Sequence, residues 1–170
     1  PSAEHIFKAV AKTHRRCDGA YAVLALITGH GILAFRDNNG IRPLSIGIRE
    51  GKTRDEYIIA SEDALFESQG FKKLRDVEPG EAIYIDKKGN FFSQQCAEAP
   101  QKRPCIFEYV YFSRPDSNID EISVYKARMR MGSKLAELIK KKNPDHDIDV
   151  VIPIPDSSTT AALQLAVDLN

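Results

Sequence analysis

Short apolar runs separated by turn-forming residues fill the first half of the chain. Strands are predicted at residues 20–27, 32–35, 43–48, 56–61, 81–86 and 90–93. The first two runs are joined by a Gly-rich turn, and the last two flank Lys87-Lys88-Gly89, so each of these pairs predicts a β-hairpin. We therefore expect mostly antiparallel β-structure up to about Ser93, preceded by a short helix over residues 6–12.

A different pattern begins after the polar connector at residues 94–103. Residues 105–112 are rich in aromatic and β-branched side chains, which favours a strand. Pro115 cannot continue a central strand. Apolar residues then recur at helical spacing from Ile122 to Ile139, which predicts a helix with a Lys-rich end.

The end of the sequence predicts a strand–loop–helix unit. Residues 149–155 have the apolar composition of a buried parallel strand, residues 156–160 form a hydroxyl-rich loop, and residues 161–169 predict a helix. Such a unit needs neighbouring strands to cover its apolar surface, so we expect the sequence to be cut at Asn170 from a larger sheet.

Composition narrows the class of protein. The 170 residues, 42% hydrophobic and 28% charged, suffice for one folded domain or parts of two. The 24 basic and 24 acidic residues cancel, which weighs against nucleic-acid binding. The sequence shows no membrane-spanning run and no signal peptide, so we expect a cytoplasmic protein. Its three cysteines lack C-x-x-C spacing, which favours reduced thiols.

The loop Asp156-Ser157-Ser158-Thr159-Thr160 is the segment most suggestive of chemistry. Its hydroxyl groups would lie at the amino end of the last predicted helix, where phosphate or a phosphate-bound metal ion binds favourably. The alternative is that Asp156 or Ser157 only caps the helix, which stabilises it by about 1 kcal/mol. The residues alone favour the cap, because no P-loop sequence accompanies them.

Other polar residues favour structural roles. The turn at residues 36–44 and the segment Arg114-Pro115-Asp116 could each bind an anion, but internal hydrogen bonds and ion pairs are the more common use of such turns. The four histidines lack metal-ligand spacing and are expected in polar surroundings. Cys105 is expected to be a small buried residue, and residues 140–142 a solvated helix end.

Three segments together closely resemble, in order, the glutamine phosphoribosylpyrophosphate amidotransferases. They are FRDNNGIRPL at residues 35–44, PCIFEYVYFSRPDS at residues 104–117 and VVIPIPDSS at residues 150–158. The turn in the first segment is shared more loosely with other N-terminal-nucleophile amidotransferases, whereas the other two point to this family. The resemblance covers nearly the whole chain and is weakest before Cys17.

The resemblance implies a mixed α/β and α+β fold in two parts. Residues 1–113 would be the C-terminal part of an N-terminal-nucleophile glutaminase β-sandwich domain, and residues 114–170 the start of a phosphoribosyltransferase domain with a parallel sheet. The family forms 5-phosphoribosylamine, glutamate and pyrophosphate from glutamine, water and phosphoribosyl pyrophosphate with Mg²⁺, the first committed step of de novo purine biosynthesis. A full-length member would be a homo-oligomer, dimeric or tetrameric, inhibited by purine nucleotides.

Site residues carry over position by position. Asp156, Ser157 and Ser158 match the substrate-binding loop of the transferase domain, and Ser157 matches a side chain that helps hold Mg²⁺ and the pyrophosphate. Phe107 and Tyr111 match positions near the interface of the two active sites, where aromatic side chains would wall off an ammonia path from water. Cys105 also matches a cysteine that ligates a [4Fe-4S] cluster in some members and not in others.

The family nucleophile is an N-terminal cysteine, whereas this sequence begins with Pro1 and its first cysteine is Cys17. The resemblance is therefore to a central fragment that carries no catalytic residue and is inactive alone. One alternative is another N-terminal-nucleophile amidotransferase such as asparagine synthetase. The sequence of residues 152–158 argues against asparagine synthetase. The other is a non-catalytic binding protein derived from the glutaminase domain.

Overall fold

The chain forms two compact units, Pro1–Cys105 and Ile106–Asn170. The structure is a computed structural model that describes residues 2–169. Its mixed α/β architecture with antiparallel sheets confirms the expected fold class. The assignment of residues 1–113 and 114–170 to a glutaminase and a phosphoribosyltransferase domain stays a prediction.

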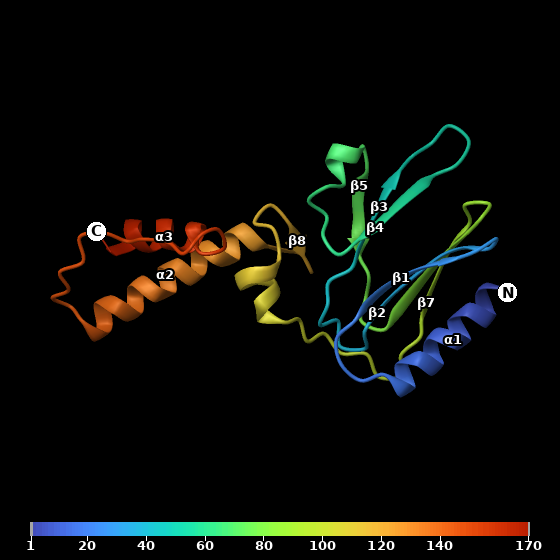
Figure 1. Ribbon diagram of the computed structural model, residues 1–170, viewed down its shortest axis with the longest axis horizontal. Coiled ribbons are helices and arrows are strands. Elements are labelled where there is room, and N and C mark those ends of the chain that lie inside the picture. Colours follow the sequence, from blue (N-terminus) through green and yellow to red (C-terminus); the bar gives the residue numbers. More distant parts are fainter. Residues whose placement is uncertain (1, 170) are drawn as a thin grey trace. The chain divides into compact units, whose positions relative to one another are not determined.

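Two antiparallel sheets form the framework of the first unit (Figure 1). One has the order β1-β2-β6-β7, formed by Ala22–Ile27, Gly31–Arg36, Glu81–Asp86 and Phe91–Gln95. The other has the order β4-β3-β5, formed by Glu56–Ala60, Ser45–Arg49 and Lys72–Asp76. The sequence predicts all of these strands except β5, whose residues KKLRD contain a single apolar side chain and so show no alternation.

The helix α1, Ala3–Arg16, covers one face of the four-stranded sheet. It begins at Ser2, whose hydroxyl accepts a hydrogen bond from the backbone N–H of His5. Its buried side chains Ile6, Phe7 and Val10 pack in one cluster with residues of β2 and β6. A second cluster, on Ala34, Leu44, Ile46, Val77 and Ile83, joins the two sheets. The unit is thus a helix on a pair of sheets, and the predicted N-terminal helix is confirmed.

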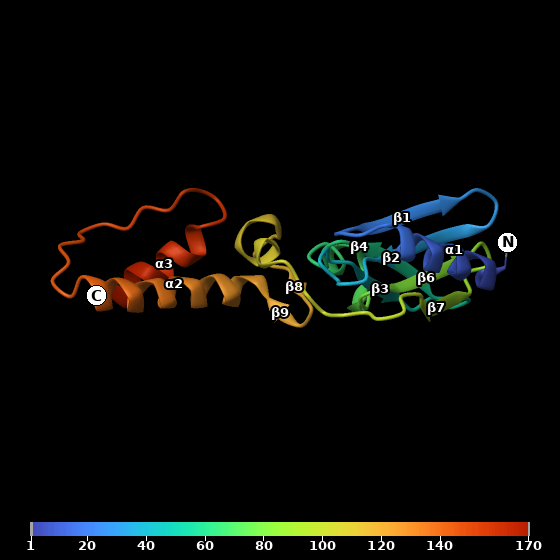
Figure 2. The same ribbon diagram turned by 90° about the horizontal axis from the view of Figure 1, so that it is seen from below.

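Two long helices dominate the second unit: α2, Val124–Lys142, and α3, Thr159–Leu169. The hydroxyl of Ser123 caps α2 by accepting a hydrogen bond from the N–H of Lys126, and the helix ends in exposed lysines as predicted. Figures 1 and 2 show α2 and α3 side by side, with the segment between them running back along both. The short strands β8, Asn118–Ile119, and β9, Ile122–Ser123, precede α2.

The prediction of a strand over residues 105–112 is wrong. The backbone is helical from Ile106 and continues as a π-helix, η2, over Glu108–Phe112. The helical form buries Tyr109 in a cluster with Ile119 and Val124. Strand preference depends on a neighbouring strand, so packing against the second unit's core decides the conformation.

The prediction of a buried strand over residues 149–155 is also wrong. Residues 147–154 have no regular secondary structure, and Ile152 and Ile154 are each 82% exposed. A parallel strand needs a paired neighbour for its N–H and C=O groups. Among residues 2–169 no strand pairs with this segment, so the apolar sequence forms no strand and several of its side chains are exposed.

Candidate functional site

The hydroxyl-rich loop lies where the sequence places it, directly before α3. Asp156 is exposed, whereas Ser157 and Ser158 are half-buried. The hydroxyl of Ser158 donates to the carbonyl oxygen of Ile154, and the backbone N–H of Thr159 donates to the carbonyl oxygen of Asp156 at 3.2 Å. These bonds fold the loop into turns and bring all three predicted substrate-binding residues together at the amino end of α3.

The amino end of α3 is suited to an anion. The first N–H groups of a helix lack partners within the helix, and the helix dipole places partial positive charge there. The eleven residues of α3 give it a full dipole. The Ser158 hydroxyl donates to a carbonyl oxygen at this end of the helix. The alternative that Asp156 or Ser157 caps the helix stays a prediction. The loop can therefore offer backbone and hydroxyl donors to phosphate oxygens.

An apolar cavity of about 400 Å³ adjoins this loop within the second unit. It is lined by Val110, Met131, Gly132, Leu135, residues 151–154, Ser157, Ser158, Ala161, Ala162 and Leu165. Such a lining suits apolar side chains and not a pyrophosphate. The polar side of the loop, and not this cavity, is therefore the candidate anion site.

The two predicted aromatic residues lie together on one short helical segment. Phe107 and Tyr111 are 58% and 63% exposed, and each ring lies near the ring of Phe112, at centroid distances of 6.3 and 5.7 Å. Tyr109 points the opposite way, into the core. The helix thus presents an exposed aromatic surface, and its predicted role as a wall against water stays a prediction.

The arginine–aspartate turn at residues 36–44 has the structural role that its composition favours. Arg36 is 1% exposed and donates to the carbonyl oxygens of Arg42, Val77 and Gly40 at 2.7, 2.8 and 2.8 Å. Asp37 is fully buried and accepts hydrogen bonds from the backbone N–H groups of Asn39, Ile41 and Arg42. Both charges are used to fix the turn. The Arg114–Asp116 pair, 2.8 Å apart, likewise braces its own exposed segment.

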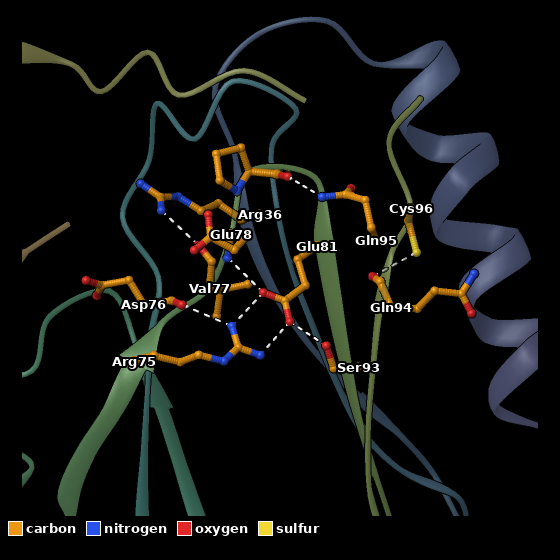
Figure 3. Close-up of polar contacts among 11 residues, drawn as sticks. Arg36, Arg75, Asp76, Val77, Glu78, Glu81, Ser93, Gln94, Gln95 and Cys96 are labelled. Atoms are coloured by element: carbon orange, nitrogen blue, oxygen red, sulfur yellow. Dashed lines mark hydrogen bonds and ion pairs between the residues drawn. The ribbon is translucent and has the colours of Figure 1, made fainter. Parts of the chain in front are cut away.

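Sequence reasoning missed a second buried ionic group, centred on Glu81 (Figure 3). The carboxylate accepts two hydrogen bonds from Arg75, at 2.6 and 2.7 Å, and further bonds from the Ser93 hydroxyl and the Glu78 N–H. Burial raises the pKa of Glu81, but these hydrogen bonds outweigh it and hold the pKa below its ordinary value. The four residues come from β5, β6, β7 and the turn between β5 and β6, so no sequence spacing reveals the group.

One prediction on the histidines is wrong, because His14 is only 4% exposed. Its ring stacks on Tyr21 and meets Phe35 edge-on, and Nδ1 lies 2.7 Å from the Tyr21 hydroxyl. Burial lowers the pKa of His14. The apolar face of α1 includes position 14, which the short predicted helix over residues 6–12 does not reach.

The cysteines differ in exposure and reactivity. Cys17 is exposed, Cys96 is buried, and Cys105 is half-buried instead of buried as predicted. Burial and the nearby charge of Glu81 raise the pKa of Cys96 to about 11, so its thiol is almost fully protonated at neutral pH. Among the described residues no three His, Cys, Asp or Glu side chains gather as a metal site.

Two solved structures show which class of protein this chain resembles. This chain superposes on glutamine phosphoribosylpyrophosphate amidotransferase from B. subtilis, complexed with ADP and GMP, with a TM-score of 0.78 and 39% identity over 93% of this chain and 32% of that one. A structure described as the allosteric regulatory enzyme of purine biosynthesis gives a TM-score of 0.78 and 38% identity over the same shares. At this coverage both similarities include residues of both units.

Curated relatives then give the particular protein that the chain resembles. It is 58% identical over 166 residues to the amidophosphoribosyltransferase of Pseudomonas aeruginosa, 56% over 165 residues to that of Escherichia coli and 49% over 168 residues to that of Saccharomyces cerevisiae. These matches cover 98%, 96% and 96% of this chain. The chain spans about a third of the length of these relatives, 33% in each case, and no family model matches it. The resemblance expected from its three segments is confirmed.

Proposed function

We propose that this sequence is part of an amidophosphoribosyltransferase, which transfers nitrogen from glutamine to phosphoribosyl pyrophosphate and forms 5-phosphoribosylamine, glutamate and pyrophosphate. The observation that supports it most is the 58% identity to such an enzyme over 98% of the chain. The antiparallel sheets of the first unit are consistent with the glutaminase part of such an enzyme. By this proposal the protein is a glycosyltransferase with glutamine amidotransferase activity, placed at the start of purine synthesis.

The chain's own residues would bind and orient the phosphoribosyl donor. The N–H groups at the amino end of α3 and the hydroxyl of Ser157 would hold the pyrophosphate, whose negative charge the helix dipole favours. Holding the leaving group in place stabilises the charge that develops on it. The exposed rings of Phe107 and Tyr111 would keep water from ammonia on its way to the donor.

The loop also fits a magnesium ion. Mg²⁺ prefers oxygen ligands and commonly takes one or two from the protein and the rest from substrate phosphates and water. The Ser157 hydroxyl is half-buried, next to the exposed Asp156 carboxylate, so Ser157 can supply such a ligand. When bound, the ion would neutralise charge on the leaving pyrophosphate. A [4Fe-4S] cluster takes four cysteine ligands, so Cys105 would need three further cysteines from the rest of the full-length protein to hold one.

The proposal is tested on the full-length gene product. Purified protein is supplied with glutamine, phosphoribosyl pyrophosphate and Mg²⁺, and phosphoribosylamine and glutamate are measured. We expect both products to appear only when all three are present. A glutamine-dependent reaction that needs ATP and aspartate would indicate an asparagine synthetase, and tight ligand binding without turnover would indicate a binding protein. The 170-residue chain assayed by itself is expected to form no product.

The proposal also covers regulation by nucleotides, cellular location and oligomeric state. Purine nucleotides are expected to inhibit the enzyme, since the similar B. subtilis enzyme is described in complex with ADP and GMP. No helix of residues 2–169 is long and apolar enough to cross a membrane. We propose a cytoplasmic homo-oligomer, dimeric or tetrameric, which sedimentation of the full-length protein and cell fractionation would test.

A further inference from the structure

The π-helix η2 is held by a buried arginine that lies on another element. Arg128, in α2, is 4% exposed. Its Nε donates to the carbonyl oxygen of Tyr109 and its Nη2 to the carbonyl oxygen of Ser113, both at 2.8 Å. The two acceptors lie at the start and just beyond the end of η2. One guanidinium therefore bridges the backbone from Tyr109 to Ser113.

These bonds support a helix of an uncommon kind. A π-helix is a rare conformation, found mostly as a single turn and often at functional sites. The N–H of Ser113 closes the turn on the carbonyl oxygen of Glu108 at 3.0 Å, and the Tyr109 hydroxyl donates to the carbonyl oxygen of Ile119 at 3.3 Å. The carbonyl groups at its end would otherwise lack helical partners.

The outer face of the same segment carries the aromatic surface. Tyr109 points inward toward α2, while Phe107, Tyr111 and Phe112 are all more than half exposed. Because the backbone between Tyr109 and Ser113 is fixed at both ends by Arg128, the direction of the Tyr111 side chain is fixed as well. A substitution of Arg128 would therefore displace the aromatic side chains although none of them is itself substituted.

We propose that Arg128 is a positioning residue for nitrogen transfer: it sets the π-helical backbone of η2 and thereby holds Tyr111 in place against water. This inference rests on the proposed function. Lysine cannot replace the residue, because an ammonium group is a single point and cannot reproduce two donors aimed at separated carbonyl oxygens. A misplaced wall would let ammonia escape, so glutamine would be hydrolysed without product.

The test compares Arg128→Lys with Arg130→Lys, an exposed arginine on the same helix, in the full-length enzyme. Phosphoribosylamine formation is measured with glutamine and with free ammonia, together with glutamate release.

For Arg128→Lys we expect glutamine-driven synthesis to fall about tenfold or more, because small displacements near reacting groups have effects of that size. Ammonia-driven synthesis should be retained, and the ratio of glutamate to phosphoribosylamine should rise. Arg130→Lys should behave as wild type. An unchanged ratio in Arg128→Lys would overturn the inference.

A second measurement separates this inference from the proposed function and from a folding defect. In the unaltered 170-residue chain, the Arg128 Nε–H signal is expected to exchange with solvent far more slowly than that of Arg130, as measured by NMR. Equal, rapid exchange would contradict the contact itself. If the full-length wild type forms no product from either nitrogen source, the proposed function fails whatever the exchange shows. If Arg128→Lys lowers ammonia-driven synthesis as much as glutamine-driven synthesis, the role is structural and the inference fails.

Discussion

At the scale of single residues, the first unit contains buried charged side chains that are hydrogen-bonded to the backbone. Arg36 is the largest side chain among those with almost no exposed surface, and its guanidinium donates to three backbone carbonyls. Buried charge is costly unless it is hydrogen-bonded, so this arginine is tolerated only because the turn supplies acceptors. The hydrogen bonds of the Arg36 side chain in turn fix the conformation of residues 36–44.

Replacing Arg36 with Gln is expected to destabilise the first unit by about 3 kcal/mol or more, because buried carbonyl groups would be left without donors. Urea unfolding followed by circular dichroism measures the loss. Arg54→Gln, at an exposed position, is the matched control and should change stability by less than about 0.5 kcal/mol. Equal stability of the two variants would refute the structural role.

The Glu81 group predicts a pH dependence. Its pKa is lowered in the folded state, so its contribution to stability is present above the unfolded pKa near about 4.3 and is lost as pH falls through the folded value. Glu81→Gln is therefore expected to cost about 2 kcal/mol at pH 7, since Arg75 loses its carboxylate, and this difference should shrink as pH falls below about 4.

Unfolding curves of wild type and Glu81→Gln, taken in urea over this pH range, measure that difference. Glu50→Gln serves as the control, because Glu50 is exposed. A difference between wild type and Glu81→Gln that stays constant from pH 7 to pH 3 would mean that the carboxylate's charge is not what stabilises the group.

At the scale of elements, close approach of two helices shapes the second unit. Gly132 in α2 faces α3 so closely that an added Cβ would lie 2.3 Å from the carbonyl oxygen of Ala161. That oxygen belongs to the backbone, so relief would require the helices to separate. The glycine is retained in the middle of a helix at a cost in intrinsic helix propensity of about 1 kcal/mol.

Gly132→Ala is accordingly expected to destabilise the packing of α3 although it favours the helical conformation of α2. Hydrogen exchange should become faster along α3 and the unfolding midpoint should fall. Arg130→Ala on the exposed side of α2 provides the comparison and should leave α3 unchanged. A stabilised Gly132→Ala protein would show that α3 can move away at no cost.

At the scale of the whole molecule, the proposed enzyme separates binding of the phosphoribosyl donor from hydrolysis of glutamine. The candidate anion site lies entirely in the second unit, in the loop before α3. A change confined to that loop should therefore affect one substrate and not the other.

In the full-length protein, Ser157→Ala is expected to weaken binding of phosphoribosyl pyrophosphate with Mg²⁺ about tenfold, the equivalent of one hydrogen bond or metal ligand of about 1.4 kcal/mol. Glutamine hydrolysis measured by itself should not change. Calorimetric titration of Ser157→Ala against Ser133→Ala, a serine of α2, provides the measurement. Unaltered affinity would remove Ser157 from the site.

Local patterns in the sequence account for most of the first unit. The hairpins follow from alternating apolar residues around glycine turns, and α1 follows from its apolar spacing, since these signals act over a few residues. The three family segments likewise identify the resemblance, and the loop at residues 156–158 can be located from its position before a helical run. His14, however, lies beyond the predicted helix, and only packing on Tyr21 and Phe35 makes it a buried residue.

The tertiary structure decided what depends on partners distant in the sequence. The aromatic residues 105–112 favour a strand by composition. In the helical form, however, Tyr109 packs in the core of the second unit, and Arg128 donates hydrogen bonds to two backbone carbonyl oxygens. Residues 149–155 have the composition of a buried strand, yet residues 2–169 provide no strand to pair with them. The Glu81 group assembles from three strands and a turn. Propensity is set by each residue and its neighbours, whereas pairing and burial are set by the rest of the fold.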